Sequence, residues 1–148
     1  MNKTYRTILK WGDPDYETHL DRHELRAVME SLGLAESDIQ KRYKPGDEIV
    51  KLKKKPGLSA AGIKSLERLV GRENVSTDEF DRAYHSHGKF YLELLKMRSG
   101  IIDTPPDAVV YPRNERDVVS VMDFCRKRGM PITPIGGRSS VTRGVETP

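Results

Sequence analysis

Long apolar runs are missing from this chain of 148 residues. No stretch approaches the roughly 20 apolar residues that a membrane-spanning helix needs. The basic N-terminus also lacks the apolar core of a secretory signal. Cysteine occurs once, at Cys125, so an internal disulfide is excluded, which suits a reducing compartment. Because Cys125 lies among apolar residues of an expected helix, we expect a buried, inert thiol. The absence of a signal and of a membrane-spanning run leads us to expect a soluble, cytoplasmic protein.

A large excess of one charge is also missing. The chain has 26 basic and 22 acidic residues, and the net charge of +4 gives only mild attraction to anions. One basic run, Lys51–Lys55, follows further basic residues between positions 41 and 44 and could contact nucleic acid or an anionic membrane. Asp47 and Glu48 interrupt the run, so we expect a solvated loop and no nucleic-acid partner. Weak contact with a membrane surface stays open.

The histidines do not predict a metal site. His85 and His87 are two residues apart, a spacing that does not share a helix face. His19 and His23 have the i, i+4 spacing, but no acidic third ligand accompanies them. We therefore assign no metal ligand, and we expect His85 and His87 to be surface or helix-capping residues.

Residues 1–104 predict a helical region. Apolar residues recur there at helical spacing, and capping residues and glycines mark the ends. Ser76 and Glu79 have the spacing of a capping box. Around Ile49 and Leu52 we expect a short strand or an extended link. The expected helices run from near Asp21 to Gly33, Ser37 to about Arg42, Ser59 to Val70, Ser76 to about Tyr84, and Phe90 to about Arg98.

Residues 105–148 follow a different pattern. After the proline-rich linker that ends at Pro106, the run Ala108–Tyr111 predicts a strand. A helix then begins near Asn114, and the run Ile132–Ile135 predicts a second strand. A strand, a helix and a strand form a βαβ unit, in which the two strands are parallel and the crossover is right-handed. The fold class is therefore α+β, with a helical region over residues 1–104 and a second domain that begins at residue 105.

Two glycines directly after the second expected strand indicate a binding loop. Gly136 and Gly137 permit positive φ and close approach of a ligand to the backbone. Successive amides in such a turn bind anions, and two serine hydroxyls add donors, so the expected guest is a phosphate or pyrophosphate. A plain glycine turn between two strands is the alternative. The pattern is neither G-x-G-x-x-G nor a Walker A loop. The candidate binding residues are Pro134, Ile135, Gly136, Gly137, Arg138, Ser139 and Ser140.

The last third of the chain resembles the start of the FAD-binding domain of the vanillyl-alcohol-oxidase type. It is similar in particular to the subgroup of alkyldihydroxyacetonephosphate synthase and its bacterial FAD-linked oxidase relatives. The motifs that carry the resemblance are Arg98-Ser99-Gly100, Pro106–Pro112 and Pro134–Val141. Lys10-Trp11-Gly12 and the helix before His85–Gly88 fit the N-terminal helical region of that subgroup more loosely.

The resemblance implies FAD as cofactor, with its pyrophosphate on Gly136–Ser140. It also implies further strands and a second α+β domain for a small-molecule or lipid-like substrate. The family's reactions are oxidation of alcohols or hydroxy acids, or the ether-lipid step that exchanges an acyl chain for a fatty alcohol. Its catalytic histidine and tyrosine residues come from the substrate domain, so we assign no catalytic residue. We expect a chain that is incomplete and inactive by itself.

Arg138 departs from the family pattern, which usually has a third glycine at this position. If the site requires positive φ, a side chain costs about 1–2 kcal/mol. The guanidinium could offset this cost by pairing with a phosphate, or it could obstruct the flavin. Some members attach the flavin through a histidine of this loop, but residues 130–148 contain no histidine, which excludes that bond.

Two other interpretations remain. The chain could be a non-catalytic helical module that binds nucleic acid or anionic lipid through Lys51–Lys55. It could also be a truncated, inactive remnant of an FAD-linked enzyme.

Overall fold

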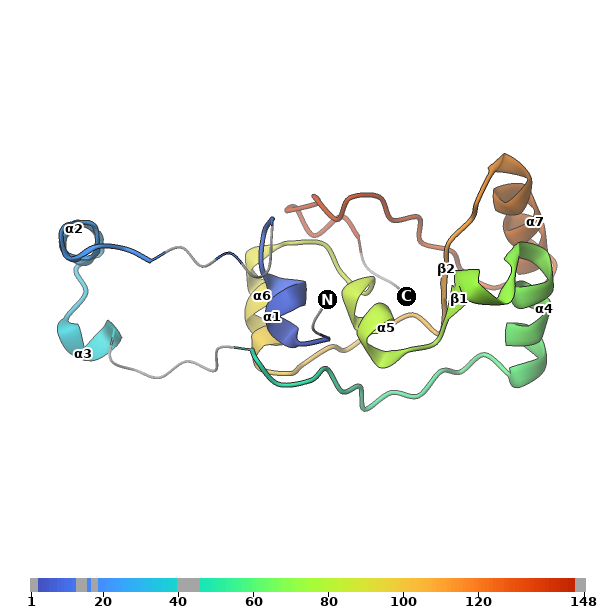
Figure 1. Ribbon diagram of the computed structural model, residues 1–148, viewed down its shortest axis with the longest axis horizontal. Coiled ribbons are helices and arrows are strands. Elements are labelled where there is room, and N and C mark those ends of the chain that lie inside the picture. The colour runs from blue at the N-terminus through green and yellow to red at the C-terminus, as the bar shows by residue number, and fades with distance from the viewer. Residues whose placement is uncertain (1–2, 13–15, 17–18, 40–45, 146–148) are drawn as a thin grey trace.

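The computed structural model describes residues 3–12, 16, 19–39 and 46–145, and Figure 1 shows how their helices and strands are arranged. The α+β class predicted from the sequence is confirmed, with most of the regular structure in helices. The helices are α1 (Tyr5–Leu9), α2 (Arg22–Leu32), α3 (Glu36–Ile39), α4 (Ala60–Val70), α5 (Glu79–Tyr84), α6 (Tyr91–Arg98) and α7 (Glu115–Arg126). A 3-10 turn spans Arg72–Asn74, and the two short strands are β1 (Val75–Ser76) and β2 (Val109–Val110).

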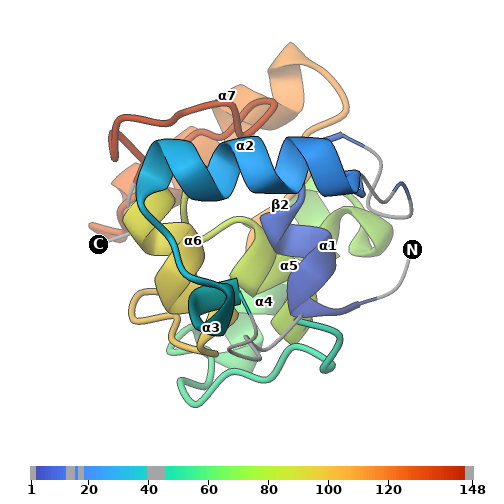
Figure 2. The same ribbon diagram turned by 90° about the vertical axis from the view of Figure 1, so that its left-hand side faces the viewer.

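Helices α2 and α3 stand apart from the other helices, at one end of the molecule in Figure 1 and in front of the body in Figure 2. The expected limits of α2 are confirmed. Asp21 accepts hydrogen bonds from the amides of His23 and Glu24, and Gly33 ends the helix with φ of 63°. Helix α3 covers the start of the second expected helix, whose residues 40–42 lie outside the described residues.

The first apolar cluster joins α1, α5 and α6. Its buried members are Tyr5, Ile8, Leu9, Val50, Phe80, Ala83 and Met97. The segment around Ile49 is an extended link, as expected, because Ile49 forms a single antiparallel bridge with Thr4 and Val50 is buried. The five-residue helix α1 has no counterpart among the sequence predictions.

The second apolar cluster joins α4 and α7. Its buried members are Leu66, Val70, Val121, Phe124 and Cys125. Both helices begin where the sequence predicts, since Ser59 accepts from the Gly62 amide and Asn114 accepts from the Asp117 amide. Burial raises the pKa of the Cys125 thiol, which agrees with an inert residue.

The two strands pair antiparallel, with Val75 opposite Val110 and Ser76 opposite Val109. The first expected strand is therefore confirmed at Val109–Val110. The parallel pairing expected for the βαβ unit is wrong for the described residues, because β2 takes its partner from the helical region and Ile132–Ile135 forms no strand there. The capping box at Ser76 is also wrong. Ser76 belongs to β1, and Asp78 caps α5 instead.

Segments on both sides of residue 104 share one core. Helix α4 and strand β1 lie before this position, whereas β2 and α7 lie after it, and the second apolar cluster contains residues from all four. The division into residues 1–104 and 105–148 stays a prediction. Over the described residues, no helix has both the length and the apolar character required to cross a bilayer.

Arg82 connects three segments that lie far apart in sequence. Its side chain, only 1% exposed, extends from α5 and donates from Nε to the Pro106 carbonyl at 2.6 Å and from Nη2 to the Lys54 carbonyl at 3.0 Å. Buried carbonyl groups need hydrogen-bond partners, and this guanidinium supplies two.

Replacing Arg82 by methionine should therefore lower the free energy of unfolding by about 3 kcal/mol, because two charge-assisted hydrogen bonds are lost and two carbonyls lose their partner. Urea denaturation measures the change. The matched control is Arg126→Met on the exposed face of α7, where a surface ion pair with Asp123 contributes below about 0.5 kcal/mol. Equal effects of the two substitutions would show that Arg82 does not hold these segments together.

Candidate functional site

The candidate loop, residues 134–140, lies on the path by which the chain returns from α7 towards α5 and α6, drawn in red in Figure 1. Gly136 and Gly137 are exposed, and a Cβ atom added at either glycine would meet nothing within 4 Å in the described part of the chain. Neither glycine has positive φ, which corrects the reason expected for their presence. Their absent side chains instead leave the backbone open to a ligand.

The left-handed residue of the loop is Arg138, with φ of 56°. Its side chain is 6% exposed, and its guanidinium carbon lies 3.7 Å from the centre of the Tyr84 ring. Burial lowers the pKa of Arg138, and the contact with Tyr84 counteracts part of that shift. Neither Nε nor Nη2 has a hydrogen-bond partner among the described residues. The side chain is therefore packed on Tyr84 and does not obstruct the open side of the glycines.

The end of the loop lies against the turn between α5 and α6. The Lys89 amide donates to the Ser140 carbonyl at 2.6 Å. A Cβ atom added at Gly88 would come within 2.5 Å of the same carbonyl oxygen, which is closer than real Cβ contacts allow. Gly88 is thus the residue that permits this close approach.

The Lys89 ammonium group reaches the C-terminal end of α1. It donates to the Ile8 carbonyl at 2.5 Å and to the Lys10 carbonyl at 2.6 Å, and its side chain is buried. Such carbonyls lack partners within the helix, and a cation at this end is favoured by the helix dipole. Burial, and to a smaller extent the charge of Arg138, lower the pKa of Lys89 to about 8.

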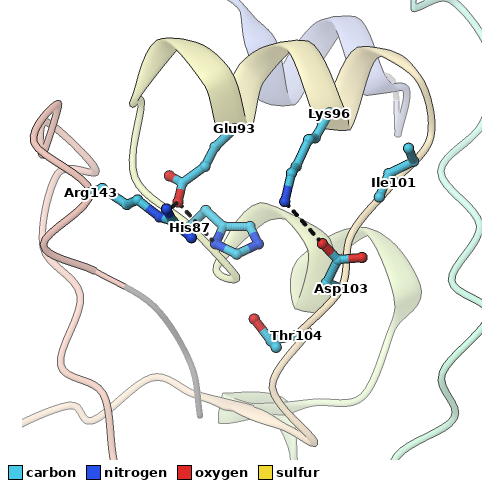
Figure 3. Close-up of a pocket in the computed structure, with 7 residues that line it drawn as sticks. All are labelled: His87, Glu93, Lys96, Ile101, Asp103, Thr104 and Arg143. Atoms are coloured by element: carbon cyan, nitrogen blue, oxygen red, sulfur yellow. Dashed lines mark hydrogen bonds and ion pairs between the residues drawn. The ribbon is translucent and has the colours of Figure 1, made fainter.

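A polar cavity of about 110 Å³ lies beside these contacts (Figure 3). Glu93 of α6 is 6% exposed, and its Oε1 lies 3.5 Å from Arg143 Nε and 3.8 Å from His87 Nδ1. Lys96 and Asp103 form an ion pair of 3.3 Å across the cavity. Arg143 lies three residues after the end of the loop, so its ion pair with Glu93 connects the segment that follows the loop to α6. The lining residues are His87, Glu93, Lys96, Ile101, Asp103, Thr104 and Arg143.

The seven candidate residues, Pro134–Ser140, form one continuous surface loop, and Arg138 is its buried member. Their role in binding stays a prediction. The residues that hold the loop are Tyr84, Gly88, Lys89 and Glu93, none of which is a site residue predicted from the sequence. The glycine and lysine directly after the His85–His87 segment were the available signal, because a glycine there indicates a close backbone contact.

The remaining sequence expectations concern histidines and lysines. His85 closes α5 as a capping residue, with Nδ1 at 2.8 Å from the Asp81 carbonyl oxygen. His19 precedes α2, so it shares no helix face with His23. Residues 3–12, 16, 19–39 and 46–145 contain no cluster of three His, Cys, Asp or Glu side chains suited to a metal. The four lysines between 51 and 55 are exposed, as a solvated loop requires.

The loop has the features that a diphosphate group needs. Two adjacent glycines are exposed, Ser139 is exposed, and the next residue after the glycines, Arg138, is a buried cation. Backbone amides in such loops bind anions without a charged side chain on the open face. The residues present therefore fit a pyrophosphate-containing cofactor.

Comparison with protein families gives the class of this segment. Residues 106–148 match the family described as FAD binding domain. The matched range begins shortly before β2 and includes α7 and the whole candidate loop. FAD is accordingly the cofactor of the domain to which residues 106–148 correspond.

Individual relatives narrow the class. Alkyldihydroxyacetonephosphate synthase of Trypanosoma brucei brucei is 30% identical over 128 residues, which cover 84% of this chain and 21% of that protein. Protein Rv2250A of Mycobacterium tuberculosis is 31% identical over 103 residues, covering 69% of this chain and 66% of that protein. A solved structure of alkyldihydroxyacetonephosphate synthase has a TM-score of 0.61 at 23% identity and covers 64% of this chain and 18% of its own. The chain is thus similar to alkyldihydroxyacetonephosphate synthase and spans about a fifth of that enzyme.

The lowered pKa of Lys89 predicts how stability depends on pH. Between about pH 8 and 10.5 the unfolded chain binds a proton at Lys89 that the folded chain does not, so the free energy of unfolding rises with pH in this window. From about pH 7.5 to about pH 9.5 Lys89 alone should contribute a rise of about 1–2 kcal/mol. The neutral amine still donates to both carbonyls. Tyr111, whose pKa is raised by burial, titrates above this range. The Cys125 thiol, whose pKa is also raised by burial, titrates within it in the unfolded chain and opposes part of the rise, so the difference between the wild type and Lys89→Met isolates the contribution of Lys89.

Urea denaturation at the two pH values tests this. Lys89→Met should abolish the rise, because methionine does not titrate, whereas the exposed Lys127→Met should keep it. A rise that survives in Lys89→Met would assign the pH dependence to another group.

Proposed function

We propose that residues 134–140 bind the pyrophosphate of FAD within an FAD-dependent oxidoreductase or an enzyme similar to alkyldihydroxyacetonephosphate synthase. The observation that carries the proposal is the open backbone at Gly136 and Gly137, within the range that matches the FAD binding domain family. The synthase relative and the shared fold support the same enzyme class.

The electrostatics of the loop suit a dianion. The exposed backbone provides the contacts, while the Arg138 charge is held beneath the loop on the Tyr84 ring. A charge in that position attracts a diphosphate without occupying its space, and low exposure weakens solvent screening of the attraction. The sequence left two roles open for Arg138. The packing on Tyr84 disfavours obstruction of the flavin. It also favours long-range attraction of the phosphate over direct pairing with it.

The substrate and the reaction belong to parts of the enzyme beyond these residues. For the whole enzyme we propose a small-molecule or lipid-like substrate, and no residue of this chain is assigned to catalysis. The loop alone leaves the flavin ring without a pocket. The 148-residue chain should therefore bind FAD weakly, with a Kd in the millimolar range, which corresponds to a binding free energy of about −4 kcal/mol.

Pyrophosphate titration followed by amide chemical shifts tests the loop directly. Pyrophosphate should shift the amides of Gly136–Ser140 in the wild-type chain. The double substitution Gly136→Ala with Gly137→Ala should weaken binding about tenfold or more, because two methyl groups fill the space over the amides and each lost hydrogen bond to a charged group is worth about 1.5–3 kcal/mol. Folding should be unaffected, since both Cβ positions are open.

Gly144→Ala is the matched control, because its Cβ would make only ordinary contacts at 3.6 and 3.7 Å. It should bind pyrophosphate as the wild type does. Shifts confined to the lysines between 51 and 55, or equal affinity of the double variant and the control, would refute the proposed loop function. The first result would favour the basic-loop module.

A further inference from the structure

The segment 131–145, which contains the candidate loop, forms no helix or strand. A segment without its own ladder of hydrogen bonds takes its conformation from the surfaces on which it packs. The contacts of this segment with the rest of the chain therefore decide how its amides are presented to a ligand.

Three of these contacts fall on one stretch of the helical region. Arg138 packs on Tyr84, Ser140 accepts a hydrogen bond from Lys89, and Arg143 pairs with Glu93. The loop residues involved are two and three positions apart, and their partners follow one another in the same order along α5, the turn and α6. These three contacts hold the loop at its middle, at its end and three residues beyond its end.

The turn itself is fixed from the other side. We define it as Ser86–Lys89, the 86–89 turn. Ser86 is fully buried and its hydroxyl donates to the Ala83 carbonyl at 2.7 Å. The Lys89 ammonium binds the carbonyls of Ile8 and Lys10 at the end of α1. The turn is thus tied to the first apolar cluster, and it presents the bare Gly88 backbone to Ser140.

We infer that the 86–89 turn, together with Tyr84 and Glu93, positions the pyrophosphate loop, so that cofactor affinity is set in part by residues about 50 positions earlier in the chain. Gly88, Lys89, Tyr84 and Glu93 are positioning residues in this view, because each acts through the loop and contacts no cofactor atom. The inference rests on the proposed FAD function of the loop.

Gly88→Ala is the most direct test. The added Cβ would meet the Ser140 carbonyl oxygen at 2.5 Å and the Ser140 Cβ at 3.1 Å, so the loop must move. In the free protein, amide shifts should change at residues 84–93 and 136–143 and stay unchanged in α4 and α7. Pyrophosphate affinity should fall about tenfold, the effect of losing about 1.4 kcal/mol of binding free energy. Gly144→Ala should change neither the distant amides nor the affinity.

Glu93→Gln is the second variant, and it keeps the size of the side chain. Positioning predicts about threefold weaker binding, because the ion pair with Arg143 is lost. A purely electrostatic role predicts the opposite sign, since removing a negative charge near the loop would strengthen the binding of an anion. If Gly88→Ala fails to fold, Glu93→Gln decides the question by this sign.

The outcomes separate the inference from the proposed function. Unchanged loop amides or unchanged pyrophosphate affinity in Gly88→Ala, or tighter binding in Glu93→Gln, overturns the positioning role while the proposed function stands. If wild-type protein shows no loop response to pyrophosphate, the proposed function fails. Shifts of the loop amides in Gly88→Ala would then support positioning of the loop conformation alone.

Discussion

Carbonyl groups on long connecting segments, which need hydrogen-bond partners, are the constraint on which this fold depends. The segments around Lys54, Pro106 and Lys10 lie outside regular helices and strands, so their carbonyls need partners from elsewhere. Arg82 supplies two of these partners and Lys89 supplies two more, one of them at Lys10. Two cationic side chains thus replace the hydrogen-bond ladders that a larger sheet would provide, and they connect α1, α5 and the segments that lead to α4 and β2.

Local signals made much of the helical structure predictable. Asp21, Ser59 and Asn114 cap their helices through hydrogen bonds to amides two or three residues away, which sequence spacing reveals. Strand pairing was harder to predict from the sequence because a strand needs a partner that is distant in the chain. Val109–Val110 pairs with β1, whereas Ile132–Ile135 pairs with no strand among the described residues. Because Ser76 belongs to β1, Asp78 caps helix α5 in its place.

The residues of the candidate loop were predictable from the sequence, but the residues that support the loop were not. The glycines of the loop and the unusual Arg138 were evident from the sequence, because glycine pairs after an apolar run mark backbone accessibility. The supporting residues were not, since the burial of Lys89 and Glu93 results from long-range packing that no spacing encodes. Neither role considered for the Arg138 side chain included a stacked position on Tyr84.

The charge of Arg138 is poorly compensated in the free chain. Positive φ costs a non-glycine residue about 1–2 kcal/mol, and a desolvated cation–π contact returns about 2 kcal/mol. The two guanidinium nitrogens that lack partners among the described residues add a cost of about 1–3 kcal/mol each. These terms leave the buried charge undercompensated in the free chain. In the proposed function, a diphosphate bound at Gly136 and Gly137 would supply negative charge close in sequence to Arg138, so the residue least expected from the family pattern would add to the affinity of the loop.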